Sequence, residues 1–478
     1  MTPNVTHWQT VFRSPTRLHP CAQRQPSSII WIKPLVKDAP QLPVSAHSPL
    51  RRIAGNMGRL LSGKAAAGII SLGSIAIAAR ILGVEQYGVL NLVHGFATLM
   101  GGTIAFSGFH GMVRYGAEAL NRGAPTQFRN LVLLLALIEL GMAAVAIGVA
   151  MLLVPWVGAS LGWSPQAIQF GGLYCLAILA TVRATPQGLL QLAERFDLIG
   201  LHPVIMPLVR LVGALAILFM DGGLAAFLWV WLAAAIAEGL SMWVLCWIGT
   251  RHLAIGADGR PTLKGTRRDN PGIVRFIATT NLDLTLRDIA PKATPLIIGW
   301  MLGPAAAGLY ALVQRASAIL IQPAQMLGEA AYPVVTRLLI SGDNKAAGKA
   351  VRRSAIFATG IALLAAIIMC LFAGKVLVLL GGASFAGGAS LLILVLLGRA
   401  MIAGMPTLSA ALTAQGRPWI SARANLTSNV GMLPILPLMI WWFGLNGAGV
   451  HGILQSLVLL SLLIWSYNQS RLAPRSGM

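Results

Sequence analysis

Charged residues are scarce in this chain. Only 10% of its 478 residues are Asp, Glu, Lys or Arg, whereas 56% are hydrophobic, and the mean hydropathy is +0.73. Soluble domains carry roughly a quarter charged residues, so this composition excludes an ordinary soluble domain. Apolar runs of membrane-spanning length follow one another from about residue 57 to about residue 470. The sequence therefore predicts an all-α, multi-pass integral membrane protein.

Cysteine is also rare, with four residues in the whole chain. Cys175, Cys246 and Cys370 each stand alone in an apolar run, and no Cys-x-x-Cys or Cys/His spacing occurs. The sequence therefore predicts neither a metal site nor a disulfide framework. It also lacks the Gly-x4-Gly-Lys-Ser/Thr loop that holds nucleotide phosphates, which argues against ATP hydrolysis. We expect no cofactor.

Acidic residues are the scarcer of the two charge types, with 14 against 36 basic residues and a formal net charge of +22. In a soluble chain this excess would suggest nucleic acid as a partner. In a membrane protein it indicates basic cytoplasmic loops that face anionic lipid. We therefore expect membrane lipids, and no nucleic acid, as partners.

The apolar segments predict about twelve transmembrane helices. We expect the first six at residues 57–82, 88–112, 129–154, 168–193, 202–220 and 223–249, and the second six at residues 271–300, 304–338, 354–380, 384–413, 420–442 and 446–470. Basic residues concentrate in the even-numbered connections, while the odd-numbered ones hold little beyond Lys375. Because Lys and Arg resist translocation, the even connections and both termini are predicted to be cytoplasmic.

This topology divides the chain into two lobes. Residues 1–52 are expected to form a disordered basic cytoplasmic tail. The alternative is that translation begins at Met57. The N-lobe is expected at 53–249 with helices 1–6, a cytoplasmic linker at 250–270 and the C-lobe at 271–470 with helices 7–12. A short cytoplasmic tail follows at 471–478. Six helices per lobe is an even number, so the two lobes are predicted to be parallel repeats.

A repeated motif supports this duplication. Leu-Gly-x4-Gly-x3-Leu-Val occurs from Leu82 and again from Leu302, and Pro186 and Leu192 recur at the same offset as Pro406 and Leu412. We expect the glycines of the motif to permit tight turns and close helix approach. In transporters built from two like halves the substrate site lies between the halves, so we expect the site there.

The motif also carries a resemblance to a known family. The segment from Arg80 to Gly88 resembles the R-x-L-G-x3-Y-G signature of the polysaccharide-transport branch of the multidrug/oligosaccharidyl-lipid/polysaccharide (MOP) flippase superfamily. The segment from Met301 to Tyr310, with Gln314-Arg315 after it, is similar to that family's junction between helices seven and eight. Arg114-Tyr115-Gly116-Ala117-Glu118 resembles O-antigen and exopolysaccharide flippases. The resemblance covers about residues 55 to 470.

The resemblance implies a non-enzymatic flippase of the bacterial cytoplasmic (inner) membrane. Its substrate would be a lipid-linked oligosaccharide repeat unit on an undecaprenyl-pyrophosphate type carrier, moved by alternating access for lipopolysaccharide or exopolysaccharide synthesis. A polysaccharide polymerase and a chain-length regulator would be its candidate protein partners. The alternatives are a drug/cation antiporter of the same superfamily, a lipid II flippase, whose relatives usually have fourteen helices, and a membrane-embedded enzyme of polysaccharide assembly. Such an enzyme should show a large extramembrane loop or a DxD-type motif, and this sequence has neither.

Ionisable residues within the predicted helices are the candidate functional residues, because each costs about 2.5–3.5 kcal/mol on insertion scales. A pyrophosphate needs charge-assisted hydrogen bonds, which arginine supplies best. The expected cavity residues are Arg80, Arg183, Arg210, Arg287, Lys292, Arg315 and Arg399. The expected coupling or charge-pairing residues are Glu139, Glu238, Asp283 and Asp288. We expect no catalytic residue and no metal ligand.

The predicted seventh helix holds the densest group of charges. Asp283 and Arg287 are spaced i,i+4, as are Asp288 and Lys292. The two pairs are about 140° apart on a helical wheel, so both cannot point straight into one cavity. We favour Arg287 as the cavity-lining residue. The alternative is that all four residues form structural ion pairs within the helix.

Three other arginines have alternatives to a cavity role. Arg80 and Arg315 lie near the outer end of the repeated motif, where a long side chain can extend to the membrane interface. Arg210 lies in the middle of the predicted fifth helix, where stabilisation of the lobe is the alternative to substrate binding.

Overall fold

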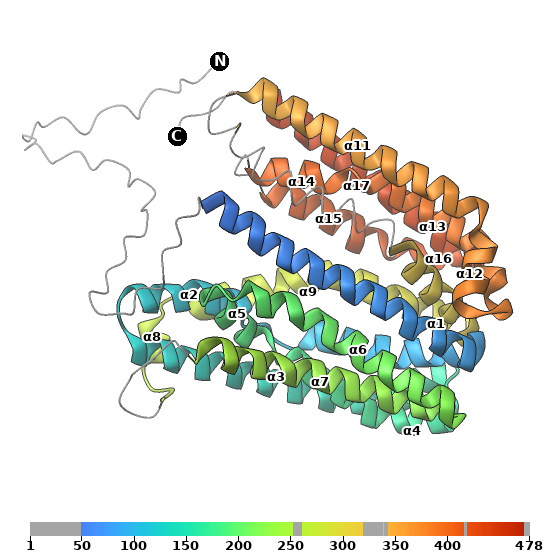
Figure 1. The fold of residues 1–478 in the computed structure, drawn as a ribbon, viewed down its shortest axis with the longest axis horizontal. Helices are drawn as coiled ribbons and strands as arrows, with labels where there is room; N and C mark the ends of the chain where they lie inside the picture. The colour runs from blue at the N-terminus through green and yellow to red at the C-terminus, as the bar shows by residue number, and fades with distance from the viewer. Residues whose placement is uncertain (1–48, 252–260, 319–337, 339–342, 415–417, 473–478) are drawn as a thin grey trace, which may run out of the picture. The chain divides into compact units, whose positions relative to one another are not determined.

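The computed structural model describes residues 49–251, 261–318, 338, 343–414 and 418–472 (Figure 1). Over these ranges the chain forms helices and no strand, which confirms the predicted all-α fold class. Most of the N-terminal tail, the middle of the linker, the second half of the predicted eighth helix and most of the C-terminal tail lie outside the described residues.

The first half of the chain contains α1 (Pro49–Ile104), α2 (Phe109–Asn121), α3 (Pro125–Ser160), α4 (Pro165–Tyr174), the 3-10 helix η1 (Cys175–Thr181), α5 (Ala184–Leu192), α6 (Phe196–Met220) and α7 (Leu224–Thr250). Short α8 (Thr266–Asp269) lies in the linker. The second half contains α9 (Ile273–Leu302), a helix described over 304–318, α11 (Asn344–Leu371), α12 (Ala373–Gly381), η2 (Ala383–Gly388), α13 (Ala389–Ile402), α14 (Met405–Ala414), α15 (Pro418–Met432), α16 (Ile435–Phe443) and α17 (Asn446–Leu472).

The first glycine of each repeated motif adopts the same backbone conformation. Gly83 has φ 68° and ψ −179° within α1, and Gly303 has φ 84° and ψ 175° directly after α9. These positive φ values strain any residue with a side chain, so glycine is required for the turn. The motif thus forms equivalent turns in the two halves, as the repeat predicted.

The predicted fourth and tenth helices are each broken near the middle. The first is divided into α4, η1 and α5, with a turn at residues 182–183, and the second into η2, α13 and α14, with a turn at residues 403–404. Pro186 and Pro406 follow these turns, in the first helical turn of α5 and α14. A proline lacks the backbone donor of an ordinary helical residue and favours a helix start. The duplication therefore extends to paired helix breaks.

The described residues contain eight helices that are long and apolar enough to span a membrane, or nine if the bent pair α15 and α16 forms one span. Three local features separate this count from the predicted twelve. The segment Ser62–Ile104 counts once although Gly83 divides it, and α9 carries too many charges to qualify. The predicted eighth helix is described only to residue 318.

The core connects the two halves through the first helix. α1 packs against α6 and α7 of the first half and against α9 and α12 of the second (Figure 1). Its fully buried side chains include Leu90, Leu92 and Tyr87, and the Tyr87 ring meets Phe385 edge-on at 5.8 Å between centroids. Residues of α9 and α12 that face α1 are therefore placed at the junction of the two halves.

Candidate functional site

A buried polar cluster in the first half surrounds Arg210. This arginine lies on α6 and is 6% exposed. Its Nη2 donates to Nε2 of His94 on α1 at 3.2 Å, and Nδ1 of His94 lies 2.9 Å from the hydroxyl of Tyr174. The guanidinium also stacks over the ring of Trp231, 4.9 Å from its centroid. Nε of Arg210 is buried and has no partner among the described residues.

A comparable cluster in the second half surrounds Arg399 on α13. Its Nη2 donates to Oε1 of Gln314, and Nε2 of Gln314 donates to the hydroxyl of Tyr310 at 2.7 Å. Gln314 follows Gly303 at the same distance along the chain as His94 follows Gly83. The same position of the repeat therefore holds one arginine and one tyrosine in each half.

Neither of these arginines has a carboxylate within 4 Å in the described part of the chain, because the ion pairs found there involve other residues. Arg315 adds a third positive charge within Coulombic range of Arg210, and Glu238, whose carboxylate is paired with Arg183, lies within the same range. A buried guanidinium without an opposite charge is costly in a medium of low dielectric constant. The two clusters consequently have an unbalanced positive charge that an anion would neutralise.

Arg183 and Arg80, by contrast, have partners. Arg183, in the turn between η1 and α5, forms an ion pair with Glu238 of α7. Arg80 donates from Nη2 to the carbonyl oxygen of Leu379 on α12 at 2.5 Å, and so connects the two halves. These contacts give Arg183 a role within the first half and Arg80 a role between halves.

Four of the five charged residues of α9 form the two intrahelical pairs that their spacing predicted. Arg287 lies 2.9 Å from Asp283, and Lys292 lies 2.9 Å from Asp288. The Lys292 ammonium lies over Gly102 of α1, where it fills the space that a side chain at Gly102 would occupy. Arg287 is about half exposed. The Lys292 pair thus borders α1, while the Arg287 side chain remains accessible.

Glu139 is the most deeply buried carboxylate in the described residues, at 1% exposure. Its Oε1 accepts hydrogen bonds from the backbone N–H of Gly108 at 2.7 Å and from the hydroxyl of Thr185 at 2.8 Å. Its Oε2 has no partner. Glu139 therefore makes hydrogen bonds to the gap between α1 and α2 and to the start of α5.

The sequence analysis missed several neutral polar residues in these clusters. Tyr174 is hydrogen-bonded to His94 of α1, and Tyr310 is hydrogen-bonded to Gln314, the partner of Arg399. Asn281 of α9 is hydrogen-bonded to Ser107, between α1 and α2. The selection considered formal charge alone. A search for any polar side chain in an apolar run would have found them, because buried polar groups require partners.

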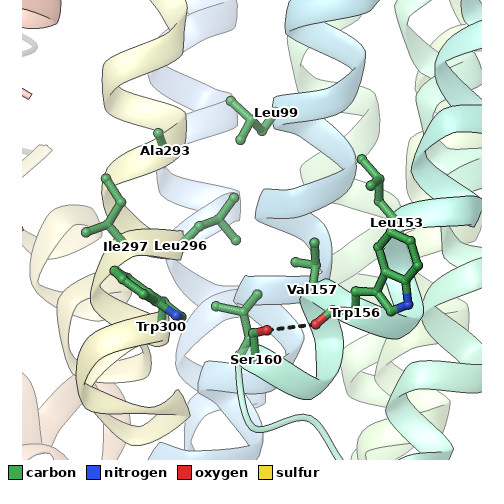
Figure 2. A pocket seen from close by; sticks show the side chains of 10 residues that line it. Leu99, Leu153, Trp156, Val157, Ser160, Ala293, Leu296, Ile297 and Trp300 are labelled. Atoms are coloured by element: carbon green, nitrogen blue, oxygen red, sulfur yellow. Dashed lines mark hydrogen bonds between the residues drawn. The ribbon is translucent and has the colours of Figure 1, made fainter.

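An apolar groove of about 400 Å³ lies between α1, α3 and α9 (Figure 2). Trp156 of α3 and Trp300 of α9 stand on opposite sides of it, with Leu99 of α1 between them (Figure 2). None of the charged candidates lines this groove. Its lining is almost entirely apolar, with Ser160 as the one polar side chain besides the two tryptophans.

Comparison with known structures shows which class of fold this is. The chain is similar to a multidrug resistance MATE family transporter of the MOP superfamily in an inward-facing conformation, with a TM-score of 0.62 and 14% identity over 90% of this chain and 99% of the other. It is also similar to the lipid II flippase MurJ in an inward closed conformation, with a TM-score of 0.66 and 12% identity over 86% and 87% of the two chains. The protein thus has the all-helical membrane fold of MOP transporters.

Sequence comparison gives the family. The profile of a family described as polysaccharide biosynthesis protein matches residues 77–387, and the chain belongs to that family. It is also 29% identical to the inner membrane protein YghQ of Escherichia coli (strain K12) over 296 residues, which cover 61% of this chain and 82% of the relative. The predicted membership of the MOP superfamily is confirmed.

Proposed function

We propose that this protein is a flippase that moves a polyprenyl-pyrophosphate-linked oligosaccharide across the bacterial inner membrane. The observation that carries this proposal is the pair of clusters around Arg210 and Arg399. Each half of the duplicated fold holds one arginine without a carboxylate partner in the described chain, next to the repeat position occupied by His94 or Gln314. An arginine of this kind in each half supplies the positive charge that a phosphorylated headgroup requires.

The chemistry of arginine favours this substrate class. A guanidinium presents donors in a planar fork that matches two phosphate oxygens, and charge-assisted bonds of this kind are about twice as strong as neutral ones. Arg315 and Arg287 are the further candidates, because both are exposed enough to reach a substrate. Arg183, Arg80 and Lys292 are proposed to support the site, since each already has a partner in the protein.

A drug/cation antiporter is the rival that the fold permits. An exporter of organic cations needs unpaired carboxylates at its site, as the cation must be neutralised there. Glu238, Asp283 and Asp288 are each paired with a basic residue of this chain, which leaves Glu139 as the one candidate carboxylate without a basic partner in the described residues, against the two arginines Arg210 and Arg399. The balance of unpaired charge therefore favours an anionic substrate over a cationic one.

The proposed orientation places both termini and the basic connections in the cytoplasm. Loops rich in Lys and Arg stay on the cytoplasmic side when the helices insert. The substrate would therefore enter from the side of the basic connections and leave on the opposite side. Movement then follows alternating access, in which the two halves rock around a site between them. No catalytic residue is needed, because flipping makes and breaks no covalent bond.

Deletion of the gene followed by analysis of lipid-linked intermediates tests this proposal. We expect one lipid-linked repeat unit to accumulate and the wild-type gene to restore surface polysaccharide, while Arg210→Ala and Arg399→Ala fail to do so at equal protein abundance. Arg122→Ala is the matched control, because Arg122 is half exposed and paired with Glu118 on α2. Normal lipid-linked intermediates and normal surface polysaccharide in the deletion strain, with no second flippase gene present, would rule the proposal out.

A further inference from the structure

Glu139 occupies a position where an acidic residue is costly. It lies on the face of α3 that points into the core, between Leu135 and Ala143, both fully buried. An ionised carboxylate in such surroundings loses its hydration, which is unfavourable unless hydrogen-bond donors or positive charge replace the water. A carboxyl group at this position therefore needs compensation in its charged form or a proton in its neutral form.

The compensation comes from the starts of two helices. Gly108, whose N–H donates to Glu139, directly precedes α2, and Thr185, whose hydroxyl donates to it, lies in the first turn of α5. Helix N-termini carry partial positive charge that stabilises an anion. The ionised carboxylate thus holds the starts of α2 and α5 to α3, while its second oxygen has no donor among the described residues.

The same segment is connected to the second half of the molecule. Ser107, next to Gly108, donates its N–H to Oδ1 of Asn281 on α9 at 2.7 Å and accepts from Nδ2 of Asn281 at 3.1 Å. The interruption between α1 and α2 is therefore held by Glu139 on one side and by Asn281 on the other. A change at the carboxylate acts directly on a contact between the two halves.

No described residue forms an ion pair with Glu139. Among the elements packed against α3, α8 carries Arg267, Arg268 and Asp269, and both arginines are exposed. His110 on α2 is exposed and its ring packs against Phe109, while Arg183 before α5 is paired with Glu238 of α7. On α9, the charged residue that follows Asn281 most closely in the sequence is Asp283, which is paired with Arg287. The remaining charge of α3 is Arg129, three helical turns away.

We propose that Glu139 is a proton-binding site that controls the connection between the two halves. In the ionised form the carboxylate attracts both helix starts and holds the Ser107–Gly108 segment against Asn281. Proton binding removes the negative charge, and with it the attraction to the two N-termini, so the segment opens more readily. Only the physiological role of this site rests on the proposed transport function: in a flippase, proton binding at Glu139 would allow the transport cycle to respond to pH.

Hydrogen–deuterium exchange of the purified full-length protein in lipid nanodiscs tests the proposal without substrate. After correction for the known pH dependence of chemical exchange, we expect the amides of residues 107–111 and 184–187 to be at least about five-fold less protected at pH 5 than at pH 9, the lower end of typical coupling between sites. Glu139→Gln cannot be ionised and should show no pH dependence in these segments. Glu118→Gln, which changes an exposed acid on α2, should behave as the wild type.

Two results would overturn the proposal. One is equal corrected protection of the wild-type segments at pH 5 and pH 9, which decides the question even if Glu139→Gln does not fold. The other is a Glu139→Gln protein that keeps the wild-type pH dependence. Glu139→Asp is a second variant for the same measurement: it retains an ionisable group and should keep a pH dependence with a different midpoint. Because the measurement uses no transport substrate, failure to find a lipid-linked intermediate in cells leaves its outcome unaffected.

Discussion

Gly88 and Gly308, the second glycines of the two motif copies, face each other where α1 meets the helix 304–318. A side chain at Gly88 would run into the carbonyl oxygen of Pro304, and one at Gly308 would run into the carbonyl oxygen of Val84. The backbones of the two halves are thus in direct contact, in a reciprocal arrangement that the duplication explains. Together with the hydrogen bond from Arg80 to the carbonyl oxygen of Leu379, this contact joins the two halves of the molecule near the two copies of the motif.

We predict that Gly88→Val separates the two halves at this contact. Backbone atoms cannot rotate away as a flexible side chain can, and overpacking of this kind costs about 1–3 kcal/mol. The closed arrangement should lose about ten-fold or more of its population, since about 1.4 kcal/mol corresponds to a factor of ten. Export of the substrate, measured by restoration of surface polysaccharide in the deletion strain, should fall accordingly.

Gly141→Val is the control for this prediction. Gly141 lies on α3 with open space around it, so the same substitution meets no other atom. It should support export at the wild-type level. If Gly88→Val and Gly141→Val were equally active at equal abundance, the close approach of the two motifs would have no role in transport.

Arg210→Met should separate stability from function. The substitution removes a hydrogen bond to His94 and the stacking on Trp231, but it also removes a buried cation without a carboxylate partner in the described residues. These effects oppose each other, so we expect the free energy of unfolding to change by no more than about 1 kcal/mol. Export should nevertheless be lost, because methionine cannot bind an anion.

The measurement for Arg210→Met combines thermal stability in detergent with restoration of surface polysaccharide. Arg122→Met serves as the control, since the Arg122 side chain is half exposed and forms an ion pair with Glu118 on the surface of α2. Retained export by Arg210→Met would assign Arg210 to the architecture of the first half alone. A large loss of stability would show that the cation is balanced by a group other than those the structure places near it.

The fold was predictable where it depends on hydrophobicity and on glycine. Long apolar runs predicted the helices, and the spacing of Gly83 and Gly303 predicted equivalent turns, because glycine alone tolerates that backbone conformation without strain. The breaks at residues 182–183 and 403–404 were not predicted. They occur inside continuous apolar runs, where hydropathy is the same for a straight helix and a broken one.

The candidate site was predictable only as a set of residue types. Charge within apolar runs identified Arg210 and Glu139, but their partners depend on which helices pack together. The contact between Arg210 and His94 joins residues 116 positions apart, and that between Arg399 and Gln314 joins residues 85 apart. Spacing along one helix predicted only the local pairs of α9, since i,i+4 neighbours meet in any helix.

The ion pair between Arg183 and Glu238 should stabilise the turn before α5. Glu238→Gln leaves Arg183 without its carboxylate, and we expect a loss of about 2 kcal/mol, below the 3–5 kcal/mol of a fully buried pair, because Arg183 is 36% exposed. The midpoint of thermal unfolding in detergent measures this loss. The double variant Arg183→Glu/Glu238→Arg should recover part of it, whereas equal instability of the double and single variants would show that the pairing itself contributes nothing.

Arg287 and Asp283 provide a test of the accessible face of α9. Exposed i,i+4 pairs contribute about 0.3–0.5 kcal/mol, so neither Arg287→Gln nor Asp283→Asn should change stability measurably. The two variants should differ in export. Arg287→Gln removes a donor for the substrate and should reduce export, while Asp283→Asn frees Arg287 from its partner and should leave export equal or higher.

The corresponding variants Lys292→Gln and Asp288→Asn should differ less from each other in export, because the Lys292 ammonium is placed against Gly102 of α1. Equal export by Arg287→Gln and Asp283→Asn would assign the Arg287 pair to the helix surface and leave substrate binding to the buried arginines.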